Sequence, residues 1–133
     1  MLGSRCPCLG WMKVTAIVPN LPVEDTDTGR DFYTGFLGLH LGFDLGWVAN
    51  LNSTANPMAQ MQLVRRDASA PENPAISVHV PDVEQAYAEA RSRGYEIVHP
   101  LTREPWGVKR FFVRAPDGSV INIVEHDDSE HVI

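Results

Sequence analysis

The sequence predicts an α+β protein made of two tandem βαβββ modules, which together form a half-barrel with a cleft. The prediction depends first on a repeated helix start, at Val23-Glu24-Asp25 and again at Val80-Pro81-Asp82. It depends second on a glycine that ends each predicted helix, Gly38 or Gly94, with three short apolar strands after each glycine. A helix covers one face of each small sheet, so the two open faces can close on each other around a cleft.

The first module is expected over residues 12–66. Its predicted elements are strands at 13–23, 39–46, 47–51 and 59–65 and a helix at 24–37. Pro19 and Pro22 favour an edge or irregular position for the first strand, because proline cannot donate a hydrogen bond to a sheet. The helix carries an apolar stripe that should pack on the sheet, made of Phe32, Tyr33, Phe36 and Leu37.

A linker is expected at 67–74 and the second module at 75–126. The predicted elements of this module are strands at 75–80, 95–99, 108–114 and 119–125 and a helix at 81–93. The segment Ala115-Pro116-Asp117-Gly118 has residues suited to a tight turn, and it joins two apolar runs into a β-hairpin. In the second run, Asn122 is the polar residue on an otherwise apolar face. The hairpin therefore predicts an amide that faces the cleft.

Composition and charge limit the partners. The net charge is −6 and the isoelectric point is about 5.2, which argues against nucleic acid or an anionic membrane as a partner. No apolar run approaches the roughly 20 residues that span a bilayer. Both cysteines, Cys6 and Cys8, lie near the start, so no disulfide framework is expected and a reducing, cytoplasmic location is predicted. Residues 1–11 are interpreted as a leader or cloning remnant before a start at Met12, and residues 127–133 as a polar tail.

Short motifs occur in a fixed order along residues 12–126. They are Asp31-Phe32-Tyr33 with Leu37-Gly38, then Val80-Pro81-Asp82-Val83, then Gly107-Val108-Lys109-Arg110-Phe111-Phe112-Val113 leading into Pro116-Asp117-Gly118. In this order the chain resembles the vicinal oxygen chelate superfamily, which includes glyoxalases, bleomycin-resistance proteins and extradiol dioxygenases. The resemblance implies a cleft in each concave sheet, often completed by a second subunit. Exposed edge strands that a partner sheet would cover also favour a homodimer.

In the metal-using relatives, a divalent metal is held by His and Glu on the concave face, and the resemblance indicates the corresponding positions here. They fall near Val18, at 60–62, at Ala75 and at Asn122. None of these residues is His or Glu, and neutral amides are poor ligands for a transition metal. We therefore expect no metal ion and no other cofactor.

Aromatic side chains near the expected inner strands and loops are candidates for binding a small molecule. The predicted ligand-binding residues are Trp47, Met61, His79, Trp106, Phe111 and Asn122. Asn20 and Ser77 could add orienting hydrogen bonds. Phe111 could equally fill the core, and His79 could be either a general base or a histidine bonded within the sheet.

The preferred hypothesis is a metal-free binder of the bleomycin-resistance kind, for an aromatic or cationic, antibiotic-like natural product. The alternative is a lyase, isomerase or dioxygenase of the glyoxalase type, either without metal or with displaced ligands such as His79, Glu125 and His126. A third class is an interaction module without a bound ligand. The sequence contains no nucleophile elbow, phosphate-binding loop or dinucleotide fingerprint. A small molecule and a second copy of the chain are thus the expected partners.

Overall fold

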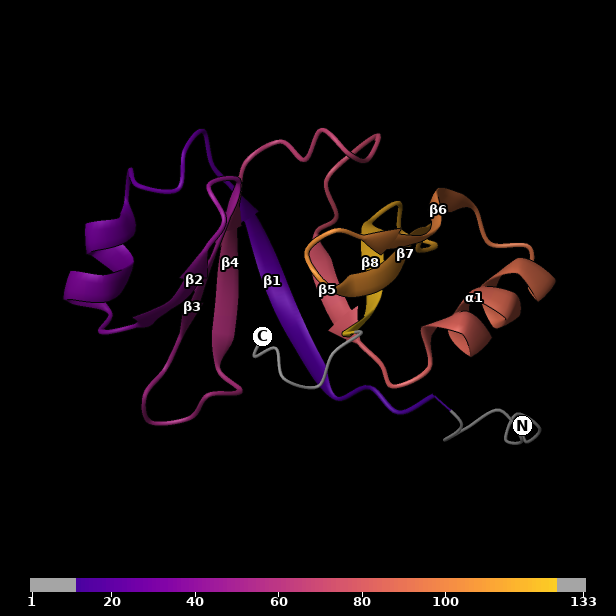
Figure 1. The fold of residues 1–133 in the computed structure, drawn as a ribbon, viewed down its shortest axis with the longest axis horizontal. Helices are drawn as coiled ribbons and strands as arrows, with labels where there is room; N and C mark the ends of the chain where they lie inside the picture. The colour runs from indigo at the N-terminus through magenta and orange to yellow at the C-terminus, as the bar shows by residue number, and fades with distance from the viewer. Residues whose placement is uncertain (1–11, 127–133) are drawn as a thin grey trace.

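The computed structural model describes residues 12–126, and these residues form one mixed eight-stranded sheet with helical segments at its two outer sides (Figure 1). The strands are β1 (Ala16–Pro22), β2 (His40–Asp44), β3 (Val48–Asn52), β4 (Gln60–Val64), β5 (Ile76–His79), β6 (Ile97–Glu104), β7 (Val108–Arg114) and β8 (Val120–His126). They are ordered β2-β3-β4-β1-β5-β8-β7-β6, so the first four strands form one half of an open sheet and the last four form the other. The α+β prediction is confirmed. The predicted leader (1–11) and tail (127–133) lie outside the described residues.

The second half of the sheet is covered by α1 (Val83–Ser92), close to the helix predicted at 81–93. Asp82 caps its first turn, because its side chain accepts a hydrogen bond from the backbone N–H of Gln85. The helix packs on the sheet through a buried core made of Val80, Val83, Ala86, Ala90, Phe111 and Ile123. This core determines which face of β7 and β8 points toward α1, and it leaves the other face for the cleft.

The helix predicted at 24–37 is wrong in length. A π-helical segment, η2 (Phe32–Phe36), follows a series of turns. The Asp25 carboxylate accepts a hydrogen bond of 2.6 Å from the backbone N–H of Thr28, and such local bonds compete with helix formation. Gly29 then has a φ of 88°, outside the helical region. Three members of the predicted apolar stripe are exposed rather than packed on the sheet: Phe32, Phe36 and Leu37.

Of the two alternatives predicted for the first strand, an edge or an irregular strand, the edge is wrong and the irregular strand is what the structure contains. β1 lies at the centre of the sheet, where it pairs antiparallel with β5 over 16–19 and parallel with β4 over 20–22. Pro19 is the last residue of the first ladder, and Pro22 is the last residue of the second. Because the strand changes partner between them, both prolines fall at ladder ends and a central strand tolerates them.

The predicted hairpin is confirmed, since β7 and β8 pair antiparallel along their whole length. The backbone N–H of Ala115 donates to the Ser119 carbonyl at 2.8 Å and closes the turn. Gly118 has a φ of 94°, which glycine adopts without strain. Asn122, opposite Phe112 in this ladder, is consequently held in a buried position at the middle of the sheet.

Candidate functional site

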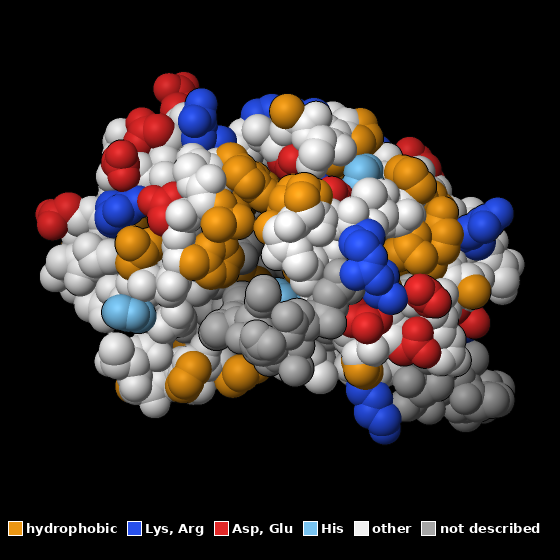
Figure 2. Space-filling view, viewed as in Figure 1, with side chains coloured by type: hydrophobic (Ala, Val, Ile, Leu, Met, Phe, Trp, Pro, Cys, Tyr) orange, Lys and Arg blue, Asp and Glu red, His pale blue; other side chains and the backbone are white. Residues whose placement is uncertain are grey.

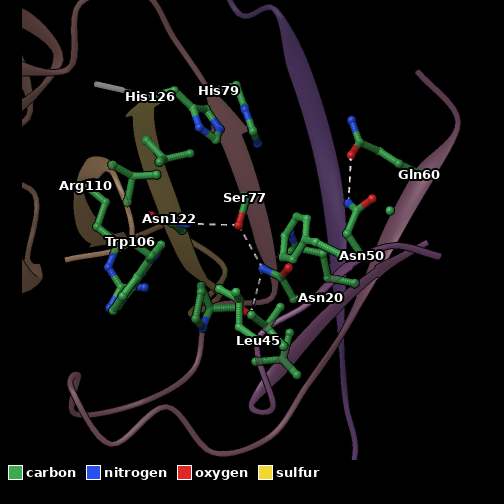
Figure 3. Close-up of a pocket in the computed structure, with 18 of the residues that line it drawn as sticks. Asn20, Leu45, Asn50, Gln60, Ser77, His79, Trp106, Arg110, Asn122 and His126 are labelled. Carbon is green, nitrogen blue, oxygen red and sulfur yellow. Dashed lines mark hydrogen bonds between the residues drawn. The ribbon is translucent and has the colours of Figure 1, made fainter. Parts of the chain in front are cut away.

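A cleft with a volume of about 690 Å³ lies between the two halves of the sheet. Residues from both halves line it, among them Asn20 on β1, Asn50 on β3, Ser77 on β5 and Asn122 on β8 (Figure 3). On the molecular surface, apolar side chains flank a hollow between the two halves (Figure 2). The open sheet faces thus enclose a space large enough for a drug-sized molecule.

The centre of the cleft is a hydrogen-bonded group of three neutral side chains, Asn20, Ser77 and Asn122. The amide nitrogens of Asn20 and Asn122 donate to Ser77 Oγ at 3.1 and 3.0 Å. The two amide oxygens are buried and have no hydrogen-bond partner among the described residues. An unsatisfied buried acceptor costs about 1–3 kcal/mol. This group therefore has acceptor capacity that the protein itself does not use.

The neighbour of Asn122 on β5 is Ser77, not Ala75. β5 and β8 pair in parallel with Ser77 opposite Asn122, whereas Ala75 precedes the strand and is exposed. On β1, Val18 is opposite Ser77, and Asn20 is the next residue on the same face. The expectation that Ala75 lies opposite Asn122 is thus wrong, and the residue found there is two positions further along the chain. Alternation along the strand correctly predicted that Ala75 and Ser77 share one face, but it did not predict which of the two is paired with Asn122.

A second amide group comes from the first half of the sheet. Asn50 Nδ2 donates to Gln60 Oε1 at 3.0 Å, and Asn52 Nδ2 donates to Asn50 Oδ1 at 3.1 Å. Gly42 on β2 packs against this group, because an added Cβ would lie 2.6 Å from Asn50 Oδ1. These bonds hold the amides in one arrangement, and the absence of a side chain at Gly42 leaves room for it.

Two tryptophans, one from each half of the chain, form one wall of the cleft. Trp47 precedes β3 and Trp106 lies between β6 and β7, and their ring centroids are 5.1 Å apart in an edge-to-face contact. The Arg110 guanidinium lies over the Trp106 ring, 5.0 Å from its centroid. An aromatic wall of this kind offers apolar contact area to a flat ligand.

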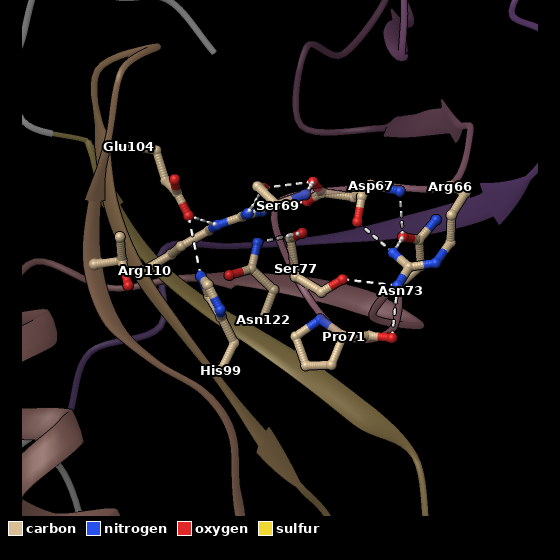
Figure 4. A network of polar contacts seen from close by, with 12 residues as sticks. Arg66, Asp67, Ser69, Pro71, Asn73, Ser77, His99, Glu104, Arg110 and Asn122 are labelled. Atoms are coloured by element: carbon tan, nitrogen blue, oxygen red, sulfur yellow. Dashed lines mark hydrogen bonds and ion pairs between the residues drawn. The ribbon is translucent and has the colours of Figure 1, made fainter.

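Next to Trp106, Arg110 is the centre of a buried ionic network (Figure 4). Its Nε donates to Glu104 at 2.7 Å and its Nη2 donates to Asp67 at 2.9 Å, and all three side chains are almost fully buried. Burial raises the pKa of Asp67, but hydrogen bonds from Ser69 and the charge of Arg110 outweigh this effect and hold the pKa below its usual value. The network ties the predicted linker to β7, so the linker is part of the cleft wall.

His79 and His126 also line the cleft, with their rings stacked and the centroids 5.1 Å apart. Burial, and secondly the proximity of His126, lower the pKa of His79 to about 4. His79 is therefore neutral at pH 7, and it presents an uncharged imidazole to the cleft.

We expect His79 to make the protein less stable in acid. Its pKa is about 6.5 in an unfolded chain and about 4 in the folded protein, so between these values the unfolded state binds the additional proton. The free energy of unfolding has its full value above about pH 6.5 and falls as the pH drops toward 4. The expected loss is roughly 1–2 kcal/mol, because the ring is partly exposed and solvent weakens the effect. Urea unfolding over this range measures the loss. In His79→Gln the free energy of unfolding should depend less on pH than in wild type. His40→Gln, at an exposed site, is the control and should behave as wild type does. Identical pH dependence in wild type and His79→Gln would contradict the assignment of the acid sensitivity to His79.

Four of the six predicted ligand-binding residues line the cleft: Trp47, His79, Trp106 and Asn122. That they bind a ligand stays a prediction. Met61 and Phe111 do not line the cleft, and their expected positions are corrected. On β4 the residues that face it are Gln60, Gln62 and Val64, and Met61 alternates to the other face. Phe111 is 1% exposed beneath α1, in edge contact with Tyr87.

The displaced metal set of His79, Glu125 and His126 is not assembled. Glu125 Oε1 accepts a hydrogen bond of 2.9 Å from the backbone N–H of Val83 at the start of α1, on the face of the sheet opposite the cleft. His126 is the next residue and therefore faces the cleft. Among residues 12–126, no three His, Cys, Asp or Glu side chains gather where they could hold a metal ion.

The lining residues that sequence reasoning missed include three with polar side chains at the cleft, Asn50, Asn52 and Arg110. The sequence does contain a signal for the two asparagines. Asn50 and Asn52 alternate with the fully buried Leu51, which is the pattern of a strand with one polar face. For Arg110 the alternation becomes a signal only once the structure has placed Phe111 in the core, because neighbours on a strand face opposite sides of the sheet. The ionic partners of Arg110, by contrast, have no signal in the local sequence.

The fold and the site together define a tandem-module protein in which two halves of one open sheet enclose a polar cleft with an aromatic wall. A family model for the Glyoxalase/Bleomycin resistance protein/Dioxygenase superfamily matches residues 13–123. The chain belongs to this superfamily. No curated protein sequence gives a significant match to it.

Solved structures with the same fold include proteins of different activities. Methylmalonyl-CoA epimerase from Mycobacterium tuberculosis is 22% identical, with 88% of this chain and 91% of that chain covered and a TM-score of 0.70. A superfamily member from Vibrio splendidus 12B01 is 17% identical, with coverages of 86% and 98% and a TM-score of 0.63. The Mn(II)-bound glyoxalase from Novosphingobium aromaticivorans is 22% identical, with coverages of 87% and 40% and a TM-score of 0.63. At these identities the likeness shows the fold alone.

Proposed function

We propose that this protein binds a small, flat aromatic molecule of the antibiotic-like kind in the cleft, without a metal ion. The observation that carries the proposal is the lining of the cleft, in which amides and a hydroxyl stand beside a tryptophan wall. Sites for small molecules typically combine apolar and aromatic area with a few placed polar groups, in volumes of about 300–1,000 Å³. The volume of this cleft, about 690 Å³, lies in that range.

The side chains at the centre of the cleft do not fit a divalent transition metal. Asn20, Ser77 and Asn122 are neutral, and both amides direct their nitrogens to the hydroxyl. Such metals favour imidazole, thiolate and carboxylate ligands. This donor set supports binding of a ligand through hydrogen bonds rather than through a metal.

The charges of the cleft favour a neutral ligand over a cation. Arg110 and Asp67, two charged residues of the lining, form an ion pair with each other at 2.9 Å. His79 is neutral at pH 7 because its pKa is lowered to about 4. A cationic ligand would therefore find no unpaired carboxylate in this lining, whereas a neutral aromatic ligand has both the tryptophan wall and the amides.

Tryptophan fluorescence tests the proposal, because Trp47 and Trp106 form the wall. We expect saturable quenching with at least one member of a panel that contains a bleomycin, an anthraquinone and an aromatic carboxamide. Flat responses throughout the panel would contradict the proposal.

A variant of Gly42 tests whether binding takes place in this cleft. In Gly42→Ala the new Cβ displaces the Asn50 side chain, so the affinity for a compound that binds wild type should fall about 3- to 10-fold, the equivalent of one or two hydrogen bonds. Gly35→Ala is a matched control, since its Cβ would also meet an oxygen, Asp31 Oδ1 at 2.9 Å, but outside the cleft. Equal affinities of the two variants would place the binding elsewhere.

Metal analysis separates this proposal from the enzymatic alternative. We expect the dialysed protein to hold far less than one equivalent of any transition metal. One equivalent of Zn, Ni, Mn or Fe that is lost in His79→Ala would instead favour a lyase, isomerase or dioxygenase.

Two further expectations, a homodimer and a cytoplasmic location, stay predictions. The homodimer follows from the resemblance to the family and from the edge strands of the sheet, β2 and β6. The cytoplasmic location follows from the positions of the cysteines. Within residues 12–126, no helix has the length and apolar character needed to cross a membrane.

A further inference from the structure

We propose that Arg110 forms a subsite in the cleft for a neutral carbonyl oxygen of the ligand. The inference rests on the proposed function and specifies the chemistry of the molecule that is bound. A guanidinium has five N–H donors. In Arg110, Nε donates to Glu104, and Nη2 donates to Asp67 and to Ser69. No acceptor within residues 12–126 bonds Nη1, so two N–H donors of a residue that lines the cleft are unused.

The guanidinium is held in place before any ligand arrives. Arg110 is only 4% exposed. Its Cζ lies 5.0 Å from the ring centroid of Trp106 and 4.8 Å from that of Phe112. Two carboxylates bind its other nitrogens. A donor fixed in this way loses little conformational freedom when an acceptor binds to it, and charge-assisted hydrogen bonds are stronger than neutral ones.

The surrounding charge selects a neutral acceptor over an anion. One cation, Arg110, already faces two carboxylates, Asp67 and Glu104, and His99 is 3.1 Å from Glu104. A carboxylate ligand would bring a third anion into this buried environment at a large desolvation cost. A carbonyl oxygen accepts from Nη1 without adding charge.

The position of Trp106 determines what carries the carbonyl. The ring of Trp106 stands beside Arg110 and also contacts Trp47, so the donor borders the aromatic wall. A group that occupies both places is an aromatic ring with a carbonyl attached. The ligand class is therefore an aryl amide, a lactam or a quinone.

Three compounds that share one ring system test the inference: 2-naphthamide, 2-naphthoate and naphthalene. In calorimetric titrations we expect wild type to bind 2-naphthamide roughly tenfold more tightly than the other two, because only the amide offers a neutral carbonyl to a charged donor. In nitrogen-15 NMR spectra, the guanidinium signals of Arg110 should shift with 2-naphthamide and remain unchanged with naphthalene.

The variant Arg110→Lys tests whether the guanidinium is the source of the preference for the amide. Lysine keeps a positive charge for Asp67 and Glu104 but lacks the fork that presents Nη1, so the preference for the amide over naphthalene should disappear. Arg114→Lys is the matched control, since Arg114 is bonded to Glu72 and Glu96 outside the cleft, and it should keep the preference. If Arg110→Lys does not fold, the NMR signals of wild type decide the question alone.

The outcomes separate the two proposals. Binding of all three compounds with equal affinity and unmoved Arg110 signals would overturn the carbonyl subsite and leave the aromatic-binding function standing. Tightest binding of 2-naphthoate would overturn the preference for a neutral acceptor. Binding of none of the three, together with flat responses to the wider panel, would overturn the proposed function itself.

Discussion

Arg110→Met is expected to lower the free energy of unfolding by about 3–5 kcal/mol, the cost of breaking a buried ion pair by removal of one partner. Asp67 and Glu104 would remain buried after the substitution without the cation that they share. Methionine fills most of the volume of the arginine stem, so the loss reports the unpaired charges rather than a cavity. Urea unfolding followed by circular dichroism measures it.

Arg114→Met is the matched control. Arg114 also binds two carboxylates, Glu72 at 2.9 Å and Glu96 at 3.0 Å, but its side chain is 30% exposed. Exposed ion pairs contribute about 0–1 kcal/mol each, so this variant should lose no more than about 1 kcal/mol. Equal losses in the two variants would show that burial is not what makes the Arg110 network costly to break.

Phe111→Ala is also expected to cost about 3–5 kcal/mol of stability, the usual effect of removing a buried aromatic ring. The ring is 1% exposed, and its centroid lies 5.0 Å from that of Tyr87 under α1. Thermal and urea unfolding measure the loss. Under conditions where the variant is folded, its affinity for a cleft ligand should match that of wild type, because Phe111 lies on the opposite face of the sheet.

Phe36→Ala controls for the chemistry of the substitution. Phe36 is 74% exposed on η2, so its removal should change stability by no more than about 0.5 kcal/mol. A stable Phe111→Ala variant with weakened ligand binding would instead place Phe111 in the cleft.

Local patterns were enough for the helix and the hairpin of the second module, but not for the strand predicted at 95–99, which the structure has as β6 (Ile97–Glu104). The Asp82 cap and the apolar spacing of α1 predicted a helix that the structure contains. The turn before Gly118 predicted the β7–β8 hairpin. Both predictions succeed because the interactions that stabilise a cap and a tight turn are made between residues close together in the sequence.

The same reasoning failed where two local preferences competed. Apolar spacing favoured a helix up to Leu37, but the bonds that Asp25 makes with nearby backbone groups and the positive φ of Gly29 shorten it to η2 (Phe32–Phe36). The prolines favoured an edge or an irregular strand, and the sequence did not decide between them; a change of partner along the central strand β1 accommodates both prolines. Neither result follows from the propensity of single residues, because the first depends on competing hydrogen bonds near Asp25 and the second on which strands pair with β1.

The sequence by itself determined the tandem α+β architecture, the neutral residue at position 122 and the tryptophans of the cleft wall. Only the tertiary structure decided which face of β4 and β7 meets the cleft, and so removed Met61 and Phe111 from it. Only the tertiary structure brought Asp67 to Arg110, across 43 residues of chain. The physical reason is that alternation along a strand is a local property, whereas the face that becomes the cleft and the partner of a buried charge are set by packing between distant segments.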